Sequence, residues 1–431
     1  MRPQDTHREL LRSLYDTAVA AAHPRSCLPA ALPPPPPEPG RIILLAAGKA
    51  AASMTAVAVA HYAPLLAQTP GRLEGIAVTR IGYGEPTGPV RLVEAGHPVP
   101  DAAGVAATRD VLDLAASAGA DDLVLVLLSG GGSANWIAPA GDLTLQEKQG
   151  ITRRLLRSGA AIGEINTLRK RLSRIKGGRL AVQAAPATLV TLAISDVPHD
   201  DPSVIASGPT VPDSSTLAQA RAVVARHGLD MPPAATALLA DGVADTPKPG
   251  DPAFATSRFT IIARPADALA AAATVARAAG YETVLLGADL EGEASEVAAD
   301  HAARAIAFAR EGRKVALLSG GELTVTIRGS GRGGPNQEYA LALAVALVGT
   351  PGICGVAGDT DGTDGGGGSP QDPAGAFVDP TTLARARAAG LDPEAMLADN
   401  DSSGFFAALG DLLVPGPTRT NVNDIRVVLI G

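Results

Sequence analysis

DDLVLVLLSGGGSANW, residues 121–136, contains six consecutive apolar residues that run directly into a glycine-rich turn. A run this apolar is typical of a strand buried on both faces of a parallel sheet. Its three glycines, flanked by Ser129 and Ser133, can direct several backbone N–H groups at one point, as phosphate binding requires. Taken alone, the stretch is equally compatible with a tight strand-to-helix turn that binds nothing.

The same pattern recurs at four other places, where an apolar run ends in small or acidic residues. These runs are RIILLAAGK (41–49), TLVTLAISD (188–196), KVALLSGGE (314–322) and GICGVAGDTDGTD (352–364). In open α/β sheets, ligands bind beyond the carboxyl ends of the strands. The five junctions therefore predict an α/β fold in which they share one polar cleft.

Length and composition narrow the class of protein. The 431 residues are enough for two or three domains, and 46% hydrophobic with only 3% aromatic residues suits a helix-rich α/β protein. A net charge of −8 without a basic block argues against nucleic-acid binding. No run approaches the roughly 20 apolar residues that span a bilayer. Cys27 and Cys354 match neither a disulfide framework nor a zinc pattern, which favours a reducing cytoplasm.

Two proline-rich segments indicate how the chain is divided. The first, residues 33–39, follows an amphipathic N-terminal helix and predicts a stiff tether before the first strand. The second, residues 241–257, is rich in Pro, Gly and Asp and is the best candidate for a domain boundary. We therefore predict a first domain over residues 1–245, including the helix and tether, and a second over residues 258–431.

Lys49 follows the strand predicted at 41–47 and lies at the start of an Ala-rich helix. The helix dipole favours anions at that end, so a functional lysine is favoured over a merely solvated one. The residue is not a Walker A lysine, because Ile43 occupies the required upstream glycine position. Asp196 ends another buried strand and is a candidate general base, whereas the acidic residues after it read more simply as a turn.

A basic run lies in a helix predicted over residues 164–183, after another at 143–163. Its members are Arg169, Lys170, Arg171, Arg174, Lys176 and Arg179. The run is compatible with an anion-binding face or, more commonly, with a solvated helix face.

The hexapeptide Gly329–Gly334 (GSGRGG) matches the dinucleotide-binding pattern GxGxxG. That fingerprint must follow a central parallel strand, whereas residues 323–328 alternate apolar and polar side chains and predict an edge strand. We therefore interpret the loop as a phosphate contact in which Arg332 supplies the charge.

An acidic loop brings Asp359, Asp361 and Asp364 within a few residues. Two carboxylates about 4 Å apart repel by roughly 4 kcal/mol at an effective dielectric of 20, so they either point into water or hold a cation. Mg²⁺ shared with substrate phosphates is the predicted cation, since it commonly takes only one or two carboxylates.

Several motifs together resemble the glycerate 2-kinase family, whose C-terminal part is known as the MOFRL domain. They are SGGGS (129–133), NTLRKRLSRIKGG (166–178), IASGPT (205–210), GGPNQE (333–338), GDTDGTDG (358–365) and TRTNV (418–422). The resemblance covers nearly the whole chain after the proline tether. It is strongest to members attached to tartrate utilisation that have been labelled hydroxypyruvate reductases.

The resemblance implies a Rossmann-like first domain and a smaller α/β second domain of the MOFRL type, with a cleft between them. It also implies phosphorylation of the 2-hydroxyl of D-glycerate with ATP and Mg²⁺, with Lys49 as the catalytic lysine. Many family members carry arginine in the motif GGRNQE, where this chain has Pro335. We expect Arg332 to supply the missing charge.

Site roles follow from the chemistry of phosphoryl transfer, in which positioning and charge neutralisation dominate. Lys49 and Arg332 would stabilise charge, and Asp196 would be the base. The metal would be held by Asp359 with Asp361 or Asp364. The residues predicted to contact the nucleotide are Ser129, Gly130, Gly131, Gly132, Ser133, Gly333, Asn336 and Glu338.

Two other functions remain open at this point. One is a nicotinamide-dependent hydroxypyruvate reductase that uses Gly329–Gly334, and the other is a non-catalytic binder of sugar acids or phosphates. The sequence also leaves open the preferred hydroxy acid, the nucleotide and the oligomeric state, including a homo-oligomer.

Overall fold

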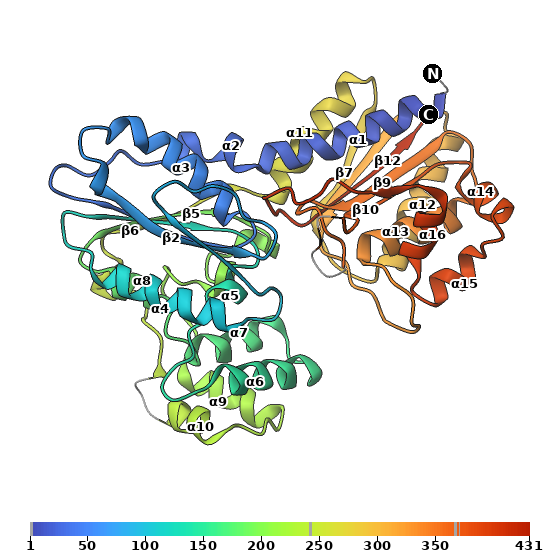
Figure 1. Ribbon diagram of the computed structural model, residues 1–431. Coiled ribbons are helices and arrows are strands. Elements are labelled where there is room, and N and C mark those ends of the chain that lie inside the picture. The colour runs from blue at the N-terminus through green and yellow to red at the C-terminus, as the bar shows by residue number, and fades with distance from the viewer. Residues whose placement is uncertain (1–2, 241–243, 366–368, 370) are drawn as a thin grey trace. The chain divides into compact units, whose positions relative to one another are not determined.

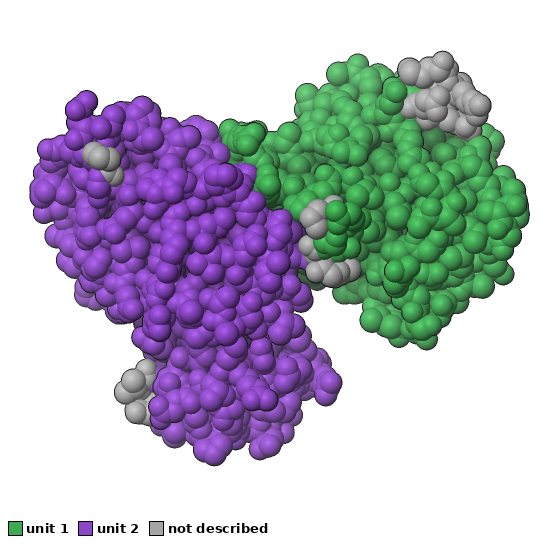
Figure 2. Space-filling view, in the orientation of Figure 1, with its two compact units in different colours: residues 1–26, 263–431 green, residues 27–262 purple. Residues whose placement is uncertain are grey.

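The computed structural model describes residues 3–240, 244–365, 369 and 371–431, so the first residues of the predicted boundary segment lie outside it. The chain forms two compact units (Figure 2): unit 2 is residues 27–262, and unit 1 is residues 1–26 with 263–431. Each unit contains a six-stranded sheet with helices, which confirms the predicted α/β class. Among the described residues, no helix has the length and apolar character needed to cross a membrane.

The sheet of unit 2 has the strand order β3–β2–β1–β4–β5–β6, and its first five strands are parallel. Its strands are β1 (Ile42–Ala47), β2 (Leu73–Arg80), β3 (Arg91–Ala95), β4 (Leu123–Leu128), β5 (Thr188–Ile194) and β6 (Ser257–Ala263). Every residue of β1 and β4 is buried, as their apolar runs predict. Figure 1 shows α3 on one face of this sheet and α4 and α8 on the other.

The strand order reverses between β1 and β4, which are paired neighbours although β2 and β3 intervene in the chain. This is the order of a Rossmann-like sheet, and ligands of such sheets bind where the order reverses, at the carboxyl ends of the two strands. The helices of unit 2 are α3 (Ala51–Leu65), α4 (Ala102–Ala116), α5 (Gly132–Asn135), α6 (Leu145–Arg157), α7 (Ile162–Arg171), α8 (Arg179–Ala184), α9 (Leu217–Arg226) and α10 (Pro233–Ala240).

The prediction of one helix over residues 164–183 is wrong. Helix α7 ends at Arg171 and α8 begins at Arg179. Between them Gly177 and Gly178 have left-handed backbones, with φ of 59° and 84°. Residues other than glycine rarely adopt a left-handed backbone, and such a backbone interrupts a right-handed helix.

Unit 1 has a mixed sheet of order β11–β10–β9–β12–β8–β7, in which β12 runs antiparallel to both β8 and β9. The strands are β7 (Glu282–Leu290), β8 (Val315–Gly321), β9 (Ile353–Asp359), β10 (Gly375–Val378), β11 (Leu412–Leu413) and β12 (Asp424–Ile430). The helices from residue 263 on are α11 (Pro265–Ala278), α12 (Ala294–Arg310), α13 (Pro335–Leu347), α14 (Thr382–Ala388), α15 (Pro393–Ala398) and α16 (Ser402–Leu409). Pro335 begins α13 at its first position, where its missing N–H would have no partner within the helix.

The N-terminal helix α1 (Pro3–Ala22) packs in unit 1, which differs from the predicted domain bounds of 1–245 and 258–431. Its apolar face includes the buried Leu14 and Tyr15, and Figure 1 shows the helix beside α11. The Tyr15 hydroxyl donates to the Asp359 carbonyl at 2.8 Å, which joins α1 to the end of β9.

Strand β6 completes the sheet of unit 2, so the chain passes between units at 26–27 and at 262–263. Amphipathicity predicts a helix with a buried face, but the partner of that face depends on the tertiary fold.

We expect Leu14→Ala to destabilise unit 1 by about 2–5 kcal/mol, because it removes a fully buried leucine side chain. Trp136, the single tryptophan, lies in unit 2, so its fluorescence reports on that unit while circular dichroism reports on both. Urea unfolding should therefore show a shifted dichroism transition and an unshifted fluorescence transition. Ser13→Ala, at an exposed position of the same helix, is the control. A shift of the fluorescence transition alone would place α1 with unit 2.

The edge strand predicted at residues 323–328 does not form. The described backbone there has a single bridge, between Thr324 and Glu293. Strand β8 already pairs with β12 on one side and β7 on the other, so it offers no edge to a further strand. The Glu293 carboxylate instead accepts the N–H and the hydroxyl of Thr326, at 3.0 and 3.1 Å.

Candidate functional site

The turn after β1 and the turn after β4 meet at the point where the strand order of unit 2 reverses. The Lys49 N–H donates to the Gly130 carbonyl at 2.8 Å, and the Ala50 N–H donates to Ser129 Oγ at 2.9 Å. The approach is so close that a Cβ on Gly48 would lie 2.4 Å from both Ser129 oxygens. The structure thus brings together two of the motifs identified in the sequence.

The side chains of Lys49 and His97 both lie against the backbone of Gly131. A Cβ built on Gly131 would be 3.4 Å from Lys49 Cγ and 3.0 Å from His97 Cδ2. His97 follows β3, whose carboxyl end lies at the same edge of the parallel sheet as that of β1. Our reading of the sequence missed His97, because β3 is only partly apolar. The position of His97 just after that strand, in AGHP (95–98), could have indicated that it lies at the carboxyl edge of the sheet.

Ser133, in α5, is the meeting point of several polar side chains. Lys176 Nζ donates to the Ser133 carbonyl at 2.6 Å and to its Oγ at 2.7 Å, while Arg169 Nη2 donates to the same Oγ at 2.8 Å. Ser207 Oγ lies 2.9 Å from Ser133 Oγ. Burial lowers the pKa of Lys176 well below its ordinary value, and the positive charges of Arg169 and Lys148 lower it further.

The other members of the basic run have different partners. Lys170 and Arg171 form ion pairs with the buried Asp213 at 3.2 and 3.5 Å, and Arg171 also pairs with Asp245 at 2.9 Å. The run is therefore neither one anion-binding face nor one solvated face. The helical spacing of the basic residues does not predict which of them bind Ser133 and which bind Asp213, because α7 ends at Arg171.

The segment Ile205–Ser207 packs beside α5 with an unusual backbone. Ala206 and Ser207 both have left-handed backbones, with φ of 50° and 63°. A Cβ on Gly132 would lie 3.1 Å from Ala206 Cβ, so this segment lies directly against the glycine turn. Residues other than glycine held in this conformation store strain, and such strain gathers at functional sites. Nothing in the sequence predicts Ser207 as a partner of Ser133.

Asp196 lies two residues beyond the end of β5 and is half-buried. Strands β1, β4 and β5 are adjacent and parallel, so Lys49, the glycine turn and Asp196 lie at one edge of the sheet. The other two junctions, after β8 and β9, belong to the sheet of unit 1. The five predicted junctions are therefore divided three and two between the units, and one cleft shared by all of them stays a prediction.

Asp364 is buried, and its carboxylate lies against the first turn of α13. Its carboxylate accepts the backbone N–H groups of Asn336 at 3.0 Å and Gln337 at 2.8 Å, and both side-chain amides also donate to it. Burial raises the pKa of Asp364 to about 7, against the opposing effect of these hydrogen bonds. The carboxylate that we assigned to a metal is thus engaged in capping a helix.

Asp359 and Asp361 form consecutive turns at the end of β9. Asp359 Oδ1 accepts the Asp361 N–H at 2.9 Å, and Asp361 Oδ1 accepts the Thr363 N–H at 2.7 Å. In the described part of the chain, no group of three or more His, Cys, Asp or Glu side chains is arranged to hold a metal ion. A cation here would therefore need further ligands, such as phosphate oxygens.

The glycine-rich loop 329–334 packs against residues 399–403. The N–H groups of Gly329, Ser330 and Arg332 donate to the side chains of Asn400, Asp399 and Asp401, respectively, at 3.0–3.2 Å. These groups are already bonded, so the geometry disfavours our interpretation of the loop backbone as a phosphate contact. The side chain of Arg332 is exposed.

The other predicted nucleotide contacts in unit 1 also have partners within the protein. Asn336 Nδ2 donates to Asp424 at 2.6 Å, and Glu338 accepts from Asn400 Nδ2 at 3.0 Å. Burial raises the pKa of Glu338. A Cβ on Gly333 would lie 2.0 Å from Ser402 Oγ. Nucleotide binding by these three residues stays a prediction.

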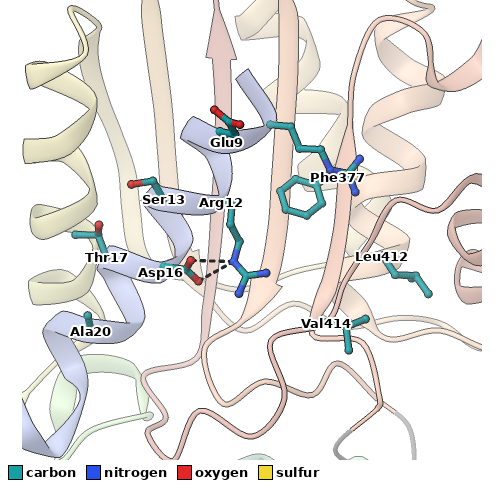
Figure 3. A pocket seen from close by; sticks show the side chains of 10 residues that line it. Glu9, Arg12, Ser13, Asp16, Thr17, Ala20, Phe377, Leu412 and Val414 are labelled. Carbon is teal, nitrogen blue, oxygen red and sulfur yellow. Dashed lines mark hydrogen bonds and ion pairs between the residues drawn. The ribbon is translucent and has the colours of Figure 1, made fainter. Parts of the chain in front are cut away.

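A groove of about 990 Å³ lies in unit 1 between α1 and the strands β10 and β11 (Figure 3). Figure 3 shows Arg12 paired with Asp16 on the helix, with Phe377, Leu412 and Val414 across from them. None of the candidate residues lines this groove, and it is not part of the site described above.

Comparison with known proteins gives two family matches. Residues 10–240 match a domain of unknown function, DUF4147, and residues 315–424 match the MOFRL family. The first match alone covers more than half of the chain.

Three relatives illustrate the similarity. An Agrobacterium vitis protein provisionally named hydroxypyruvate reductase is 48% identical over 98% of this chain and 94% of its own. The D-glycerate 2-kinase of Thermotoga maritima is 38% identical over 83% of this chain and 84% of its own. The crystal structure of glycerate kinase from the same organism superposes with a TM-score of 0.86 at 36% identity, covering 99% of this chain and 100% of that one. With the Rossmann-like sheet, the glycine turn and the MOFRL match, these similarities show that the chain belongs to the glycerate 2-kinase family.

Proposed function

We propose that this protein transfers the γ-phosphoryl group of ATP to the 2-hydroxyl of D-glycerate, forming 2-phosphoglycerate. The observation that carries the proposal is the meeting of Lys49 with the glycine turn where the strand order of a Rossmann-like sheet reverses. Relatives named glycerate 2-kinase, similar over most of their length, support it.

The predicted residues of unit 2 each have a role in this reaction. The substrate hydroxyl oxygen attacks the γ-phosphorus, the bond to the bridging oxygen breaks, and ADP leaves. Asp196 accepts the hydroxyl proton, and Lys49 neutralises charge that develops on the transferred group. The turn Ser129–Ser133 contacts phosphate oxygens through the backbone N–H groups of Gly130, Gly131 and Ser133. Those of Ser129 and Gly132 donate to the Ala47 and Ser129 carbonyls, at 3.0 and 3.2 Å. His97 is added to this set because it lies against Gly131.

Mg²⁺ fits Asp359 and Asp361 better than Asp364. Asp359 is the last residue of β9, and Asp361 lies in the turn that follows it. Carboxylate oxygens are ligands that Mg²⁺ prefers, and phosphate oxygens and water would complete its shell. The Asp364 oxygens are directed at the N–H groups of α13. The ion would neutralise phosphate charge. Gly333, Asn336 and Glu338 remain proposed nucleotide contacts.

Hydride transfer from a nicotinamide cofactor is the rival function, since some relatives carry the name hydroxypyruvate reductase. In a Rossmann sheet, the dinucleotide fingerprint lies in the first strand-to-helix turn. Here that turn, after β1, is AAGKAA (46–51) with one glycine. The hexapeptide that does match follows no strand, and several of its N–H groups are bonded. These features favour phosphoryl transfer.

A direct test offers the purified protein two reactions side by side. We expect formation of ADP from ATP and Mg²⁺ that depends on D-glycerate, and no oxidation of NADH or NADPH with hydroxypyruvate. Steady, enzyme-dependent nicotinamide oxidation without any kinase activity would overturn the proposal.

Arg332→Ala is expected to lower kcat/KM by about 10- to 150-fold, if its guanidinium replaces the arginine that many family members carry at the position of Pro335. The range corresponds to a lost charged hydrogen bond of about 1.5–3 kcal/mol. Arg328→Ala, a neighbouring exposed arginine, is the control and should change little. Unchanged kinetics in Arg332→Ala would remove this residue from the site.

A further inference from the structure

We infer that Arg169, Lys176 and Ser207 bind the carboxylate of the hydroxy-acid substrate at Ser133, beside the glycine turn. The inference rests on the proposed function and adds to it a set of residues that selects acids over neutral alcohols.

Hydrogen-bond donors at this place exceed the acceptors. The ammonium of Lys176 has three N–H donors and two acceptors, both on Ser133. The guanidinium of Arg169 has five donors, and its one hydrogen bond also goes to Ser133. Several donors are therefore available to a ligand.

The hydroxyl of Ser207 is directed by the same network. Ser133 Oγ accepts from both Lys176 and Arg169, which occupies its two lone pairs. Its own proton must then be donated to Ser207 Oγ, 2.9 Å away. Ser207 consequently has its own O–H to donate elsewhere. The left-handed backbone at Ser207 holds it in this place.

No carboxylate of the described chain balances this positive charge. Arg169 and Lys176 form no ion pair with any described residue, whereas Lys170 and Arg171 in the same run are paired with Asp213. Lys148 is a third buried lysine nearby, and its positive charge is one of the causes that lower the pKa of Lys176. Burying unpaired cations is costly, and a bound anion would offset that cost.

A ligand that accepts from every side and donates nothing is an oxyanion. The planar fork of arginine matches the two oxygens of a carboxylate. Gly131, which touches the Lys49 side chain, is two residues from Ser133, so the two Cα atoms are within about 7 Å. In a 2-hydroxy acid the carboxylate is bonded to the carbon that carries the reacting hydroxyl. A carboxylate at Ser133 therefore places that hydroxyl towards Lys49.

Steady-state kinetics of Arg169→Gln and Ser207→Ala, with D-glycerate and ATP varied separately, test this inference. We expect KM for D-glycerate to rise tenfold or more in Arg169→Gln and severalfold in Ser207→Ala, with KM for ATP within twofold of the parent. Arg174→Gln is the matched control, because Arg174 is an exposed member of the same run. Lys176→Met tests the third group, and a dichroism melt checks that this buried substitution folds.

Calorimetry with D-glycerate alone and with inorganic phosphate alone separates the possible sources of the anion. We expect the parent to bind D-glycerate and Arg169→Gln to bind it at least tenfold more weakly. Unchanged D-glycerate affinity, or a rise in KM confined to ATP together with lost phosphate binding, overturns the inference. If the parent binds D-glycerate through Arg169 without phosphorylating it, the proposed function fails and the carboxylate site stands.

Discussion

Lys49→Met is expected to lower kcat by about 100- to 1,000-fold, the range seen when one charge-stabilising group is removed from an active site. Lys49 lies between the buried strand β1 and helix α3, and its side chain runs along the backbone of Gly131. Its backbone N–H bond to Gly130 does not depend on the side chain, so the local fold should persist. A charge that meets the phosphoryl group as it transfers acts mainly in the transition state, so the loss should appear in kcat.

Two further variants sharpen this test. Lys314→Met removes an exposed lysine of unit 1 and should leave kcat unchanged. Lys49→Arg keeps the charge and should recover part of the lost rate. Thermal melts followed through Trp136 would show that unit 2 remains folded. Near-parental turnover in Lys49→Met would mean that this lysine is a solvated surface charge.

Asp364→Ala is expected to destabilise unit 1 by about 2–5 kcal/mol at pH 7.5, because it leaves the first N–H groups of α13 without their acceptor. Urea unfolding followed by circular dichroism measures this loss, while Trp136 fluorescence should be unaffected. The loss should be the same in EDTA and in excess Mg²⁺. Asp300→Ala, at an exposed position of α12, should stay within about 0.5 kcal/mol of the parent. A loss that appears only with Mg²⁺ would restore Asp364 as a metal ligand.

The pH dependence of the same variant follows from the burial of Asp364. Its pKa is raised from 3.8 to about 7 in the folded protein. Between about pH 4 and 7 the folded state therefore keeps a proton that the unfolded chain has released, so the stability contributed by this residue falls as the pH rises through that window. Asp364→Ala lacks this dependence. The difference in unfolding free energy between parent and variant should thus be larger at pH 5 than at pH 7.5, and a larger difference at pH 7.5 would contradict the raised pKa.

Local sequence patterns predicted elements that depend on near neighbours in the chain. The apolar runs of β1 and β4 indicate strands buried on both faces, and the glycines after them indicate turns, because alternation and glycine content act within a few residues. Pro335 occupies the first position of α13, where its missing N–H is tolerated. Two predictions from local patterns were wrong, each for a physical reason. The alternating residues 323–328 have the pattern of a strand, but β8, which precedes them, already pairs with a strand on each side. The helix predicted over residues 164–183 is broken after Arg171.

The sequence by itself determined the α/β class, the family and the identity of the two motifs that meet at Lys49 and the glycine turn. Only the tertiary structure decided that α1 packs with residues 263–431 and that His97 lies against the glycine turn. It also decided how the basic run is divided: Arg169 and Lys176 bind Ser133, whereas Lys170 and Arg171 bind Asp213. The physical reason is the distance along the chain over which each effect acts. Propensity and periodicity act over a turn or a strand, whereas the partner of a buried charge is whichever side chain the folded chain brings to it, often from far along the sequence.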